Sequence, residues 1–422
     1  MRMRLLELPR DMSRLQLKHL LLFLIVARLA YVILITSVSK YVPDEEFYDD
    51  LARNVLAGHG YVIHPGDSPS LYRPPLYPVF LAGMFRVFGD SHVPVLAIQF
   101  LFDLLAAVAV YKLARGMFGH TIACGAIFLC ALYPFFTYYT VRLLTESVFT
   151  MLLMGGLYWF HKGLQCGSRW FFVAAGIALG LGILCRFSLF YITPILIFVA
   201  VVTHRKERVV WVNSLICGIT VLLIIAPWTY RNYLVTGRLV LLGTGSGYNL
   251  WLGNHVPTGG RDNDELQGRD LAVLKEDIGK IIGPEKEVFS LDNDKRFSSA
   301  AIRDFKADPC ATAIVVAKKG FRFWFDVFNP GNRKVMIVLI PIQMILLVLA
   351  GIGSYLALHN LPVAWPLLLV IPYFNGIHAV TVSTFRYCIP VMPLIMILAA
   401  CAIVELRSRM AGHMNTSDSV SS

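Results

Sequence analysis

The sequence predicts an all-α membrane protein with many spans, and three observations carry this prediction. Of its 422 residues, 56% are hydrophobic and only 15% are charged, whereas soluble globular chains carry about 25% charged residues. About ten apolar runs approach the length of roughly 20 residues that a helix needs to cross a bilayer. Basic residues gather in short connections between these runs, which is typical of the cytoplasmic loops of membrane proteins.

The expected spans follow one another closely, apart from two longer loops. The first span follows a basic amino end and has no small-residue cleavage site, so we expect a membrane helix rather than a removed signal peptide. The connections YKLARGMFGH, HKGLQCGSR and THRKER are basic, and they predict that both termini lie in the cytoplasm. The expected spans cover residues 19–39, 93–111, 120–140, 144–161, 170–185, 187–203, 209–227, 336–357, 361–381 and 387–405.

Both longer loops are expected outside the cytoplasm. The first, residues 40–92, contains two stretches, 44–57 and 76–89, that read as helices lying along the membrane surface. The apolar stretch 76–89 is too short for a span. The second loop, residues 228–335, begins with strand- and turn-like sequence and becomes helix-like from 262 to 324.

These elements divide the chain into four expected parts. The net charge of +11 would suggest nucleic acid in a soluble protein. Here the basic residues report topology, so no nucleic-acid partner is expected. The parts are a transmembrane module at 1–227, an external domain at 228–335, carboxyl-terminal membrane helices at 336–407 and a disordered cytoplasmic tail at 408–422.

Charged residues at the ends of the expected spans are candidates for function, because ionisable groups next to the bilayer core are costly. Under the predicted topology these residues meet on the non-cytoplasmic side. Such a site suits a lipid phosphate that carries a polar group, because guanidinium groups bind phosphate oxygens in pairs. The candidates are Asp44, Glu45, Glu46, Arg73, Arg142, Glu146, Arg186, Arg231 and Arg386.

Each candidate also has a purely structural interpretation. Asp44 would cap the helix that follows it. Arg142 and Glu146 lie one helical turn apart and would form an ion pair. Arg73 and Arg386 would anchor the chain at the interface, with their charged ends in water.

Five segments, taken in order, resemble the polyprenyl-phosphate-sugar-dependent glycosyltransferases with the GT-C fold. They are PDEEFYDDLARNVLAGHGY, YRPPLYPVFLAGMFRVFG, YPFFTYYTVRLLTES, APWTYRNYLVTGRLV with GYNLWLGN, and FRYCIPVMPLIMILAA. The resemblance covers residues 19–405. Within this family, the chain is similar to the bacterial branch related to protein mannosyltransferases and to the lipid A aminoarabinose transferase. The resemblance implies a GT-C-type helix bundle in a bacterial inner (plasma) membrane.

The resemblance also implies a reaction and a role for each matching residue. A sugar would move from a polyprenyl-phosphate donor to a lipid, glycan or protein acceptor on the extracytoplasmic face, with inversion. Asp44, followed by Glu45, would be the catalytic base, and Arg73 would contact the carrier phosphate. A divalent metal could sit beside the two carboxylates, although the sequence does not require one. The further donor-binding candidates are Arg142, Glu146, Arg186, Arg231, Arg386 and Tyr387.

Two other classes of function remain open from the sequence. One is a transporter or flippase of lipid-linked sugars, and the other is a non-catalytic subunit of a membrane complex. Transporters often show internal repeats and binding sites near the bilayer midplane. The sequence shows no repeat, and its charged residues gather at one membrane face, which favours an enzyme.

Overall fold

The computed structural model describes residues 10–35, 43–283, 287–325, 333–358 and 361–418. Within these residues the secondary structure is entirely helical, as the predicted all-α class requires. Residues 36–39 of the first expected span and 40–42 of the first loop lie outside the described part.

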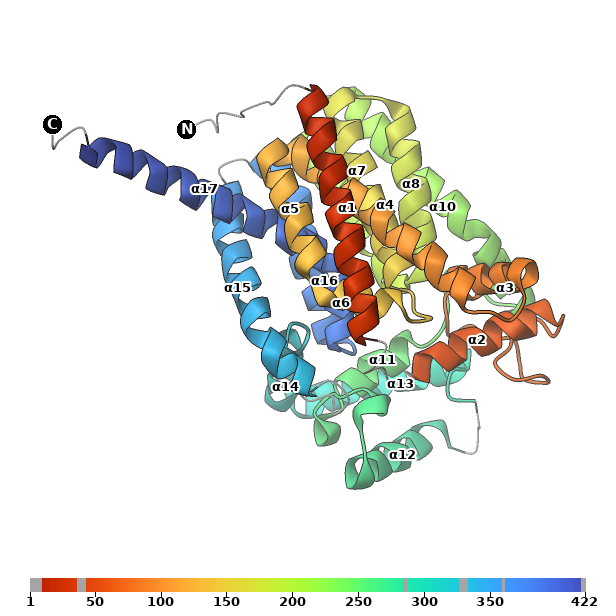
Figure 1. The fold of residues 1–422 in the computed structure, drawn as a ribbon. Helices are drawn as coiled ribbons and strands as arrows, with labels where there is room; N and C mark the ends of the chain where they lie inside the picture. Colours follow the sequence, from red (N-terminus) through yellow and green to blue (C-terminus); the bar gives the residue numbers. More distant parts are fainter. Residues whose placement is uncertain (1–9, 36–42, 284–286, 326–332, 359–360, 419–422) are drawn as a thin grey trace.

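Long apolar helices form a bundle that makes up most of the molecule (Figure 1). Among the candidate spans of the described residues, the segment Phe385–Met410, which ends within α17, has the largest buried share, at 83%. The members are α1 (Arg10–Ile35), α4 (Val93–Phe118), α5 (His120–Leu132), α6 (Pro134–Thr140), α7 (Glu146–Cys166), α8 (Arg169–Cys185), α9 (Ile192–Thr203), α10 (Arg208–Thr236), α15 (Arg333–Leu358), α16 (Leu361–Val380) and α17 (Met392–Asp418).

By length and composition, five helices of the described residues could each cross a membrane. They fall within α1, α4, α10, α15 and the segment from Phe385 through the first part of α17. A sixth span would combine α5 and α6, which meet at a bend of 60°; Pro134 opens α6 there and cannot donate to the preceding turn. The chain is therefore an integral membrane protein, while a total of about ten spans stays a prediction.

The helices of the two predicted loops lie across one end of the bundle (Figure 1). The helices α2 (Pro43–Leu56) and α3 (Leu76–Phe88) match the two helices expected in the first loop. The second loop forms a small helical domain with its own core around Trp251, Leu274 and Phe297. We call it the external domain, after the topology predicted from the sequence. Its helices are α11 (Ser246–Gly253), α12 (Gly268–Ile282), α13 (Leu291–Ala307) and α14 (Pro309–Arg322).

The structure differs from the sequence-based expectation in two segments, the stretch after residue 228 and the carboxyl-terminal tail from residue 408. The stretch after residue 228 is helical rather than strand-like, since α10 continues to Thr236 and ends at Gly237, whose φ is 65°. Its aromatic and branched residues include Tyr230 and Leu234, each 64% exposed on the bundle surface; a helix satisfies its own backbone there, which a single strand cannot do in lipid. At the other end, α17 extends to Asp418, so most of the tail expected to be disordered from 408 is helical.

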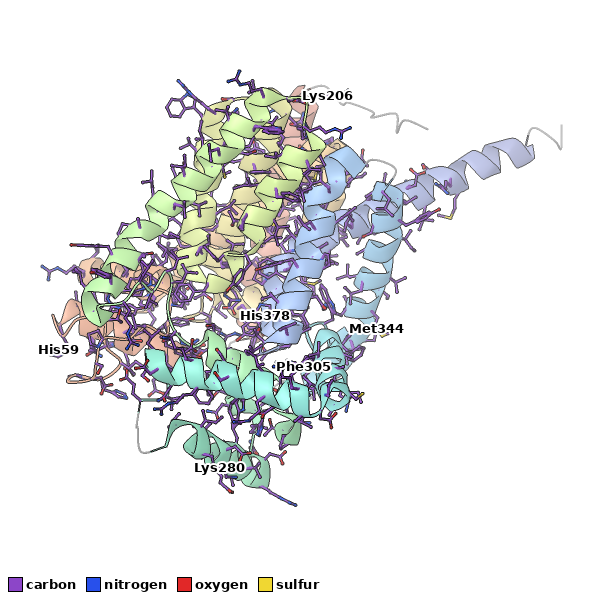
Figure 2. All side chains as sticks on the ribbon, turned by 180° about the vertical axis from the view of Figure 1, so that it is seen from behind. His59, Lys206, Lys280, Phe305, Met344 and His378 are labelled. Atoms are coloured by element: carbon purple, nitrogen blue, oxygen red, sulfur yellow. The ribbon has the colours of Figure 1, made fainter. Side chains whose placement is uncertain are left out.

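The two ends of the bundle lie one membrane thickness apart. Helix α7 has 21 residues and begins at Glu146, next to the loop helices. Its far end at Cys166 therefore lies about 30 Å away, which is the thickness of the hydrocarbon core of a bilayer. Figure 2 shows Lys206 at that far end and Lys280 at the end with the external domain.

Two exposed cysteines test the predicted topology without any added label site. Cys166 ends α7 and Cys310 lies in α14, whereas the other cysteines are buried or half-buried. We expect a membrane-impermeant maleimide to label Cys310 in intact cells and Cys166 only after permeabilisation. The variants Cys166→Ser and Cys310→Ser assign each signal. Labelling of Cys166 alone in intact cells would invert the predicted orientation.

Candidate active site

The first turn of α2 directs two adjacent carboxylates toward different partners. This turn carries Asp44, Glu45 and Glu46, at the helix end whose dipole favours negative charge. Asp44 pairs with Arg73 and Arg386, whereas Glu45 pairs with Arg142. Glu46 is exposed.

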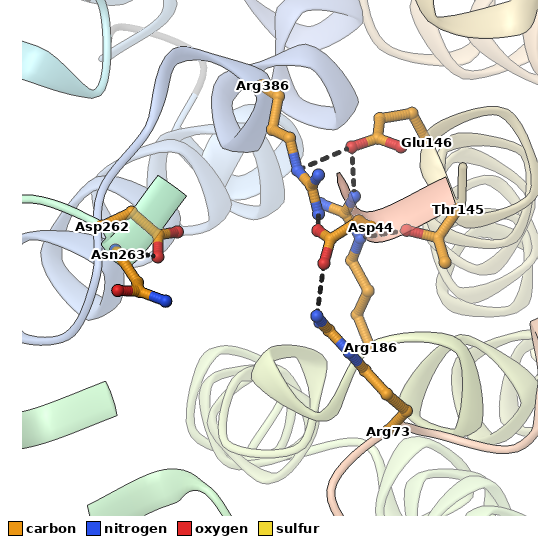
Figure 3. Close-up of polar contacts among 8 residues, drawn as sticks. All are labelled: Asp44, Arg73, Thr145, Glu146, Arg186, Asp262, Asn263 and Arg386. Atoms are coloured by element: carbon orange, nitrogen blue, oxygen red, sulfur yellow. Dashed lines mark hydrogen bonds and ion pairs between the residues drawn. The ribbon is translucent and has the colours of Figure 1, made fainter. Parts of the chain in front are cut away.

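Two guanidinium groups hold the carboxylate of Asp44 (Figure 3). Oδ1 accepts a hydrogen bond from Nη2 of Arg73, and Oδ2 lies 2.5 Å from Nη2 of Arg386. Burial alone would raise the pKa of Asp44, but the two arginines hold it well below its usual range. Asp44 is therefore ionised at any physiological pH.

Glu146 is the second carboxylate of this cluster and pairs with Arg186 and Arg386. Its Oε1 lies 2.5 Å from Nη2 of Arg186 and 3.3 Å from Nε of Arg386. Arg386 thus bridges Asp44 and Glu146, as Figure 3 shows. Nε of Arg186 also donates to Oγ1 of Thr145 over 2.8 Å. In this cluster three guanidinium groups face two carboxylates, which leaves one positive charge without a counter-charge and favours an anion.

Aromatic rings stack on the guanidinium groups of Arg73 and Arg386. The guanidinium carbon of Arg73 lies 4.7 Å from the ring centre of Tyr72, and that of Arg386 lies 5.4 Å from the ring centre of Tyr387. Stacking of this kind leaves the N–H edge of arginine available. Among the described residues, buried Nε of Arg73 has no hydrogen-bond partner, so it is a donor that a ligand oxygen could satisfy.

A cavity of about 400 Å³ opens beside the cluster, which is within the usual size of small-molecule sites. Arg73, Arg186 and Arg386 belong to its lining. Tyr191 and Leu241, which also line it, are 57% and 40% exposed, so the apolar part of the cavity reaches the bundle surface. The lining also includes the polar residues Thr244, Ser246 and Asn249 and the apolar residues Phe187, Phe190, Leu242 and Ile377.

The external domain holds one lining loop against Tyr72. Gly245 has φ 94°, and a Cβ there would lie 2.4 Å from the Tyr72 ring, so only glycine fits. The carboxylate of Asp294 in α13 accepts hydrogen bonds from the backbone amides of Gly245 and Gly247, over 2.9 and 2.8 Å. The cavity wall is thus fixed by residues far apart in the chain.

The structure places three other predicted residues outside this cluster. Arg142 and Glu45 are both buried and pair over 3.2 Å, next to a second cavity of about 220 Å³. Burial raises the pKa of Glu45, although Arg142 opposes this effect. Arg231 donates to the carbonyl of Ser70 over 2.9 Å and lies over the Trp228 ring. Arg231 therefore connects α10 to the first loop rather than lining the cavity.

Three residues near the cluster were not singled out from the sequence. Thr145 and Tyr72 are neighbours of predicted residues, and adjacency was the only available signal. Asp262 comes from the external domain and faces the cluster in Figure 3. Its surroundings, GGRDNDE, read as an ordinary polar turn, so nothing in the local pattern marks it as part of a site.

The ligand set of this site does not favour a metal. Among the described residues, no three His, Cys, Asp or Glu side chains gather in a way that could hold a metal ion. The carboxylates of Asp44 and Glu45 are already engaged by arginines, which compete with a cation for the same oxygens. The expectation that no metal is required stays a prediction, and the proposed chemistry rests on the side chains of the chain itself.

Comparisons with known proteins agree with this architecture. Residues 72–230 match the family model described as dolichyl-phosphate-mannose-protein mannosyltransferase. A search of curated proteins finds no match. The oligosaccharyltransferase AglB of Archaeoglobus fulgidus, solved with an inhibitory peptide and a dolichol-phosphate, is 15% identical at a TM-score of 0.53, covering 95% of this chain and 52% of that one.

Two further solved structures are similar. The Archaeoglobus fulgidus oligosaccharyltransferase in complex with Zn and sulfate is 16% identical at a TM-score of 0.53, covering 94% of this chain and 51% of that one. ArnT from Cupriavidus metallidurans, bound to undecaprenyl phosphate, is 16% identical at a TM-score of 0.45, covering 91% of this chain and 77% of that one; at that score the likeness carries no argument.

The chain spans about half the length of the archaeal enzymes that it resembles. The resemblance inferred from the sequence is confirmed, because the family model and the archaeal fold agree with it. The chain is thus an integral membrane protein with the GT-C fold, and its residues 72–230 are similar to the dolichyl-phosphate-mannose-protein mannosyltransferase family.

Proposed function

We propose that this protein is a membrane glycosyltransferase that moves a sugar from a polyprenyl-phosphate donor to a lipid, glycan or protein acceptor. The observation that carries the proposal is the cluster of Arg73, Arg186 and Arg386 beside the cavity, with one positive charge in excess. A sugar phosphodiester brings one negative charge, and guanidinium groups bind phosphate oxygens in pairs. The exposed apolar edge at Tyr191 and Leu241 suits the polyprenyl chain.

The similar proteins support this class of donor. The matching family is named for a dolichyl-phosphate-linked mannose, and the AglB structure contains a dolichol-phosphate together with an inhibitory peptide. The donor sugar and the acceptor of this chain are what the experiments below identify.

The transfer is a single displacement on the extracytoplasmic face. The acceptor oxygen attacks the anomeric carbon opposite to the phosphate, and the proton of the acceptor passes to a carboxylate. The bond from that carbon to the phosphate oxygen breaks, and its electron pair leaves with the polyprenyl phosphate. The three arginines stabilise the negative charge that develops on this leaving group. The anomeric centre is inverted.

The ion pairs of Asp44 set a condition on its proposed role as the base. While Arg73 and Arg386 hold its carboxylate, Asp44 is a weak base for a hydroxyl proton at neutral pH. The donor phosphate competes with Asp44 for the same guanidinium groups. Binding of the donor would therefore loosen these pairs and make Asp44 more basic.

Arg73→Ala is expected to weaken binding of undecaprenyl phosphate by roughly 10- to 100-fold, because a hydrogen bond to a charged group contributes about 1.5–3 kcal/mol. Arg73→Lys should restore part of the affinity, since lysine keeps the charge but lacks the fork. The measurement is a titration of purified protein with undecaprenyl phosphate, followed by thermal stability. Arg53→Ala, at a half-buried position of α2 that does not line the cavity, is the control. An Arg73→Ala affinity equal to that of the wild type would exclude Arg73 from phosphate binding.

The proposed function is tested on cells and on purified protein together. Mass spectrometry of surface glycans and lipids, with and without the protein, should show the loss of one sugar from one class of molecule. Purified protein should release undecaprenyl phosphate from one of its mannose, glucose or aminoarabinose derivatives, given a membrane extract as the source of acceptor. Unchanged surface composition and no release from any donor would contradict the proposal. Translocation of a labelled donor across proteoliposomes without transfer would favour a flippase.

A further inference from the structure

The cavity beside the arginine cluster offers cations and neutral polar groups to a ligand. In the part of the chain that the structure describes, its lining includes Arg73, Arg186 and Arg386 but no aspartate or glutamate. The carboxylates of Asp44 and Glu146 are paired with these arginines and do not line the cavity. A positive charge on the ligand would therefore be buried next to guanidinium groups without a carboxylate of its own, which is unfavourable.

Thr244 has a buried hydroxyl group that the protein leaves unused. The residue is 4% exposed and lines the cavity. Among the described residues, Oγ1 of Thr244 has no hydrogen-bond partner, and a buried hydroxyl without a partner costs stability. The backbone amide of Thr244 donates to the carbonyl of Leu71 over 3.0 Å, which fixes the residue beside the segment that carries Tyr72 and Arg73. A ligand hydroxyl in the cavity would satisfy Oγ1.

His378 of α16 adds a hydrogen-bond acceptor to the same cavity. Its Nδ1 lies 3.2 Å from the carbonyl oxygen of Val382. Because a carbonyl oxygen only accepts, Nδ1 carries the hydrogen, and Nε2 of the neutral ring is an acceptor. Within the described part of the chain, this bond is the only hydrogen bond of the ring. The ring stacks on Tyr387 with 4.4 Å between ring centres, so its orientation is fixed and Nε2 is left for a ligand.

The first helix of the external domain adds an amide group. Asn249 lies in α11, is half-buried and lines the cavity. Its side chain makes no hydrogen bond to the rest of the described chain. An amide both donates and accepts, as does a sugar hydroxyl. Thr244, Asn249 and His378 therefore match the hydroxyl groups of a sugar, while the arginine cluster matches a phosphate.

We propose that the donor carries a hydroxyl-bearing sugar that has no cationic amino group, and that Thr244, Asn249 and His378 bind its hydroxyl groups. The inference rests on the proposed glycosyl transfer and names the class of sugar for it. An aminated sugar such as aminoarabinose carries an ammonium group at neutral pH. The described lining has no carboxylate to pair with that ammonium group.

A panel of donors tests the class of sugar on the wild-type protein. The assay is release of undecaprenyl phosphate from its mannose, glucose, aminoarabinose and N-formyl-aminoarabinose derivatives, with a membrane extract as the source of acceptor. We expect kcat/KM for the better hexose to exceed that for aminoarabinose by about 100-fold or more, because a buried ammonium group would lie next to like charges. The N-formyl derivative, whose amine is neutralised, should be used about 10-fold better than aminoarabinose.

Two results of this panel overturn the inference while the transfer itself stands. One is an aminoarabinose derivative that is used as well as the better hexose. The other is an N-formyl derivative that is used as poorly as aminoarabinose, since shape rather than charge would then exclude both. Release from none of the four donors would contradict the proposed function, and the inference would fail with it.

Thr244→Val removes the unused hydroxyl and keeps the shape of the side chain. We expect kcat/KM with the better hexose donor to fall by about 3- to 10-fold, the scale of one neutral hydrogen bond. Binding of undecaprenyl phosphate, which lacks the sugar, should be unchanged. The melting temperature without donor should stay the same or rise, because the buried hydroxyl has no partner to lose.

Thr312 provides the matched control for Thr244. It is also 4% exposed, but its Oγ1 donates to the carbonyl of Asp308 over 3.0 Å, and it does not line the cavity. Thr312→Val should leave kcat/KM unchanged and should not raise the melting temperature. A Thr244→Val variant with the kcat/KM of the wild type, or with a lowered melting temperature, would exclude Thr244 from sugar binding.

Asn249→Asp places a carboxylate in the lining and should shift the preference among donors. We expect the ratio of kcat/KM for aminoarabinose to that for the better hexose to rise about 10-fold or more, because the ammonium group gains a partner. Gln267→Glu adds the same charge at an exposed position of the external domain outside the lining, and it should leave the ratio unchanged. An unchanged ratio in Asn249→Asp would place the sugar away from Asn249, and the wild-type panel decides the class of sugar if a variant does not fold.

Discussion

Asp44→Asn is expected to lower the rate of sugar transfer about 100-fold or more, the scale that a positioned proton acceptor or charge stabiliser contributes, while the protein stays folded. Asparagine has almost the size of aspartate and can accept hydrogen bonds from Arg73 and Arg386, but it lacks the charge that holds them together. The arginines should then spread apart. Undecaprenyl phosphate should still bind, because the positive charge of the cluster increases.

The control for Asp44 lies on the same helix. Asp50 is half-buried on α2, and the sequence predicts a solvated role for it, so Asp50→Asn should keep nearly the wild-type rate. The measurements are the turnover of the purified variants and their melting curves. Asp44→Asn protein with wild-type turnover would rule out any catalytic role of Asp44, and unfolded Asp44→Asn protein would favour a purely structural one.

The pH dependence of stability gives a second signature of Asp44. Its folded pKa is depressed, so the stability that it contributes is present above its unfolded pKa of about 3.9. That stability is lost only as the pH falls through this value toward the folded pKa. Between pH 5 and 8, a comparison of the wild type with Asp44→Asn should therefore show a constant difference in stability. A difference that vanishes at pH 5 would mean that Arg73 and Arg386 do not hold Asp44.

The position of the cluster could be predicted from the sequence, but its pairings could not. Asp44, Arg73, Glu146, Arg186 and Arg386 lie at the ends of apolar runs, where charged residues are rare and topology alone brings them to one face. Which side chains pair depends on the rotation and crossing of the helices, which hydropathy does not report.

Two residues show this limit in opposite ways. Arg231 also lies near the end of a span, yet its side chain turns toward Ser70 and Trp228. Asp262 faces the cluster in Figure 3 although the nearest expected span is far from it in the sequence. Its position depends on how the external domain folds back onto the bundle, through contacts such as Tyr72 with Phe289 at 3.7 Å between ring centres.

The strand-like interpretation after residue 228 failed for a different reason. Branched and aromatic residues favour strands on a half-buried sheet surface in water, and short apolar runs are ambiguous between helix and strand. At the end of a membrane helix the same residues can face lipid. The backbone then has to satisfy its own hydrogen bonds, and α10 continues through this sequence.

Glu146→Gln is expected to have the largest effect on stability, because the carboxylate is 1% exposed and serves both Arg186 and Arg386. Removing one member of a buried ion pair typically costs about 3–5 kcal/mol, since the remaining charge stays buried without compensation. Glutamine keeps the shape, so we expect a cost of about 3 kcal/mol, near the lower end of that range. The measurement is the melting temperature of the purified protein in the absence of donor.

A bound phosphate should rescue the Glu146→Gln variant, and this distinguishes a charge effect from a packing effect. Undecaprenyl phosphate supplies negative charge to Arg186 and Arg386, so it should raise the melting temperature of the variant more than that of the wild type, and it should bind the variant at least as tightly. Turnover should still fall, because the product then leaves more slowly.

Glu405→Gln is the matched control: this carboxylate pairs with the exposed Arg409 on α17, and a surface pair of this kind contributes only about 0.3–0.5 kcal/mol. A Glu146→Gln variant with the melting temperature of the wild type would mean that the cluster is not held together by its charges. A destabilised variant that undecaprenyl phosphate does not rescue would place the phosphate away from Arg186 and Arg386.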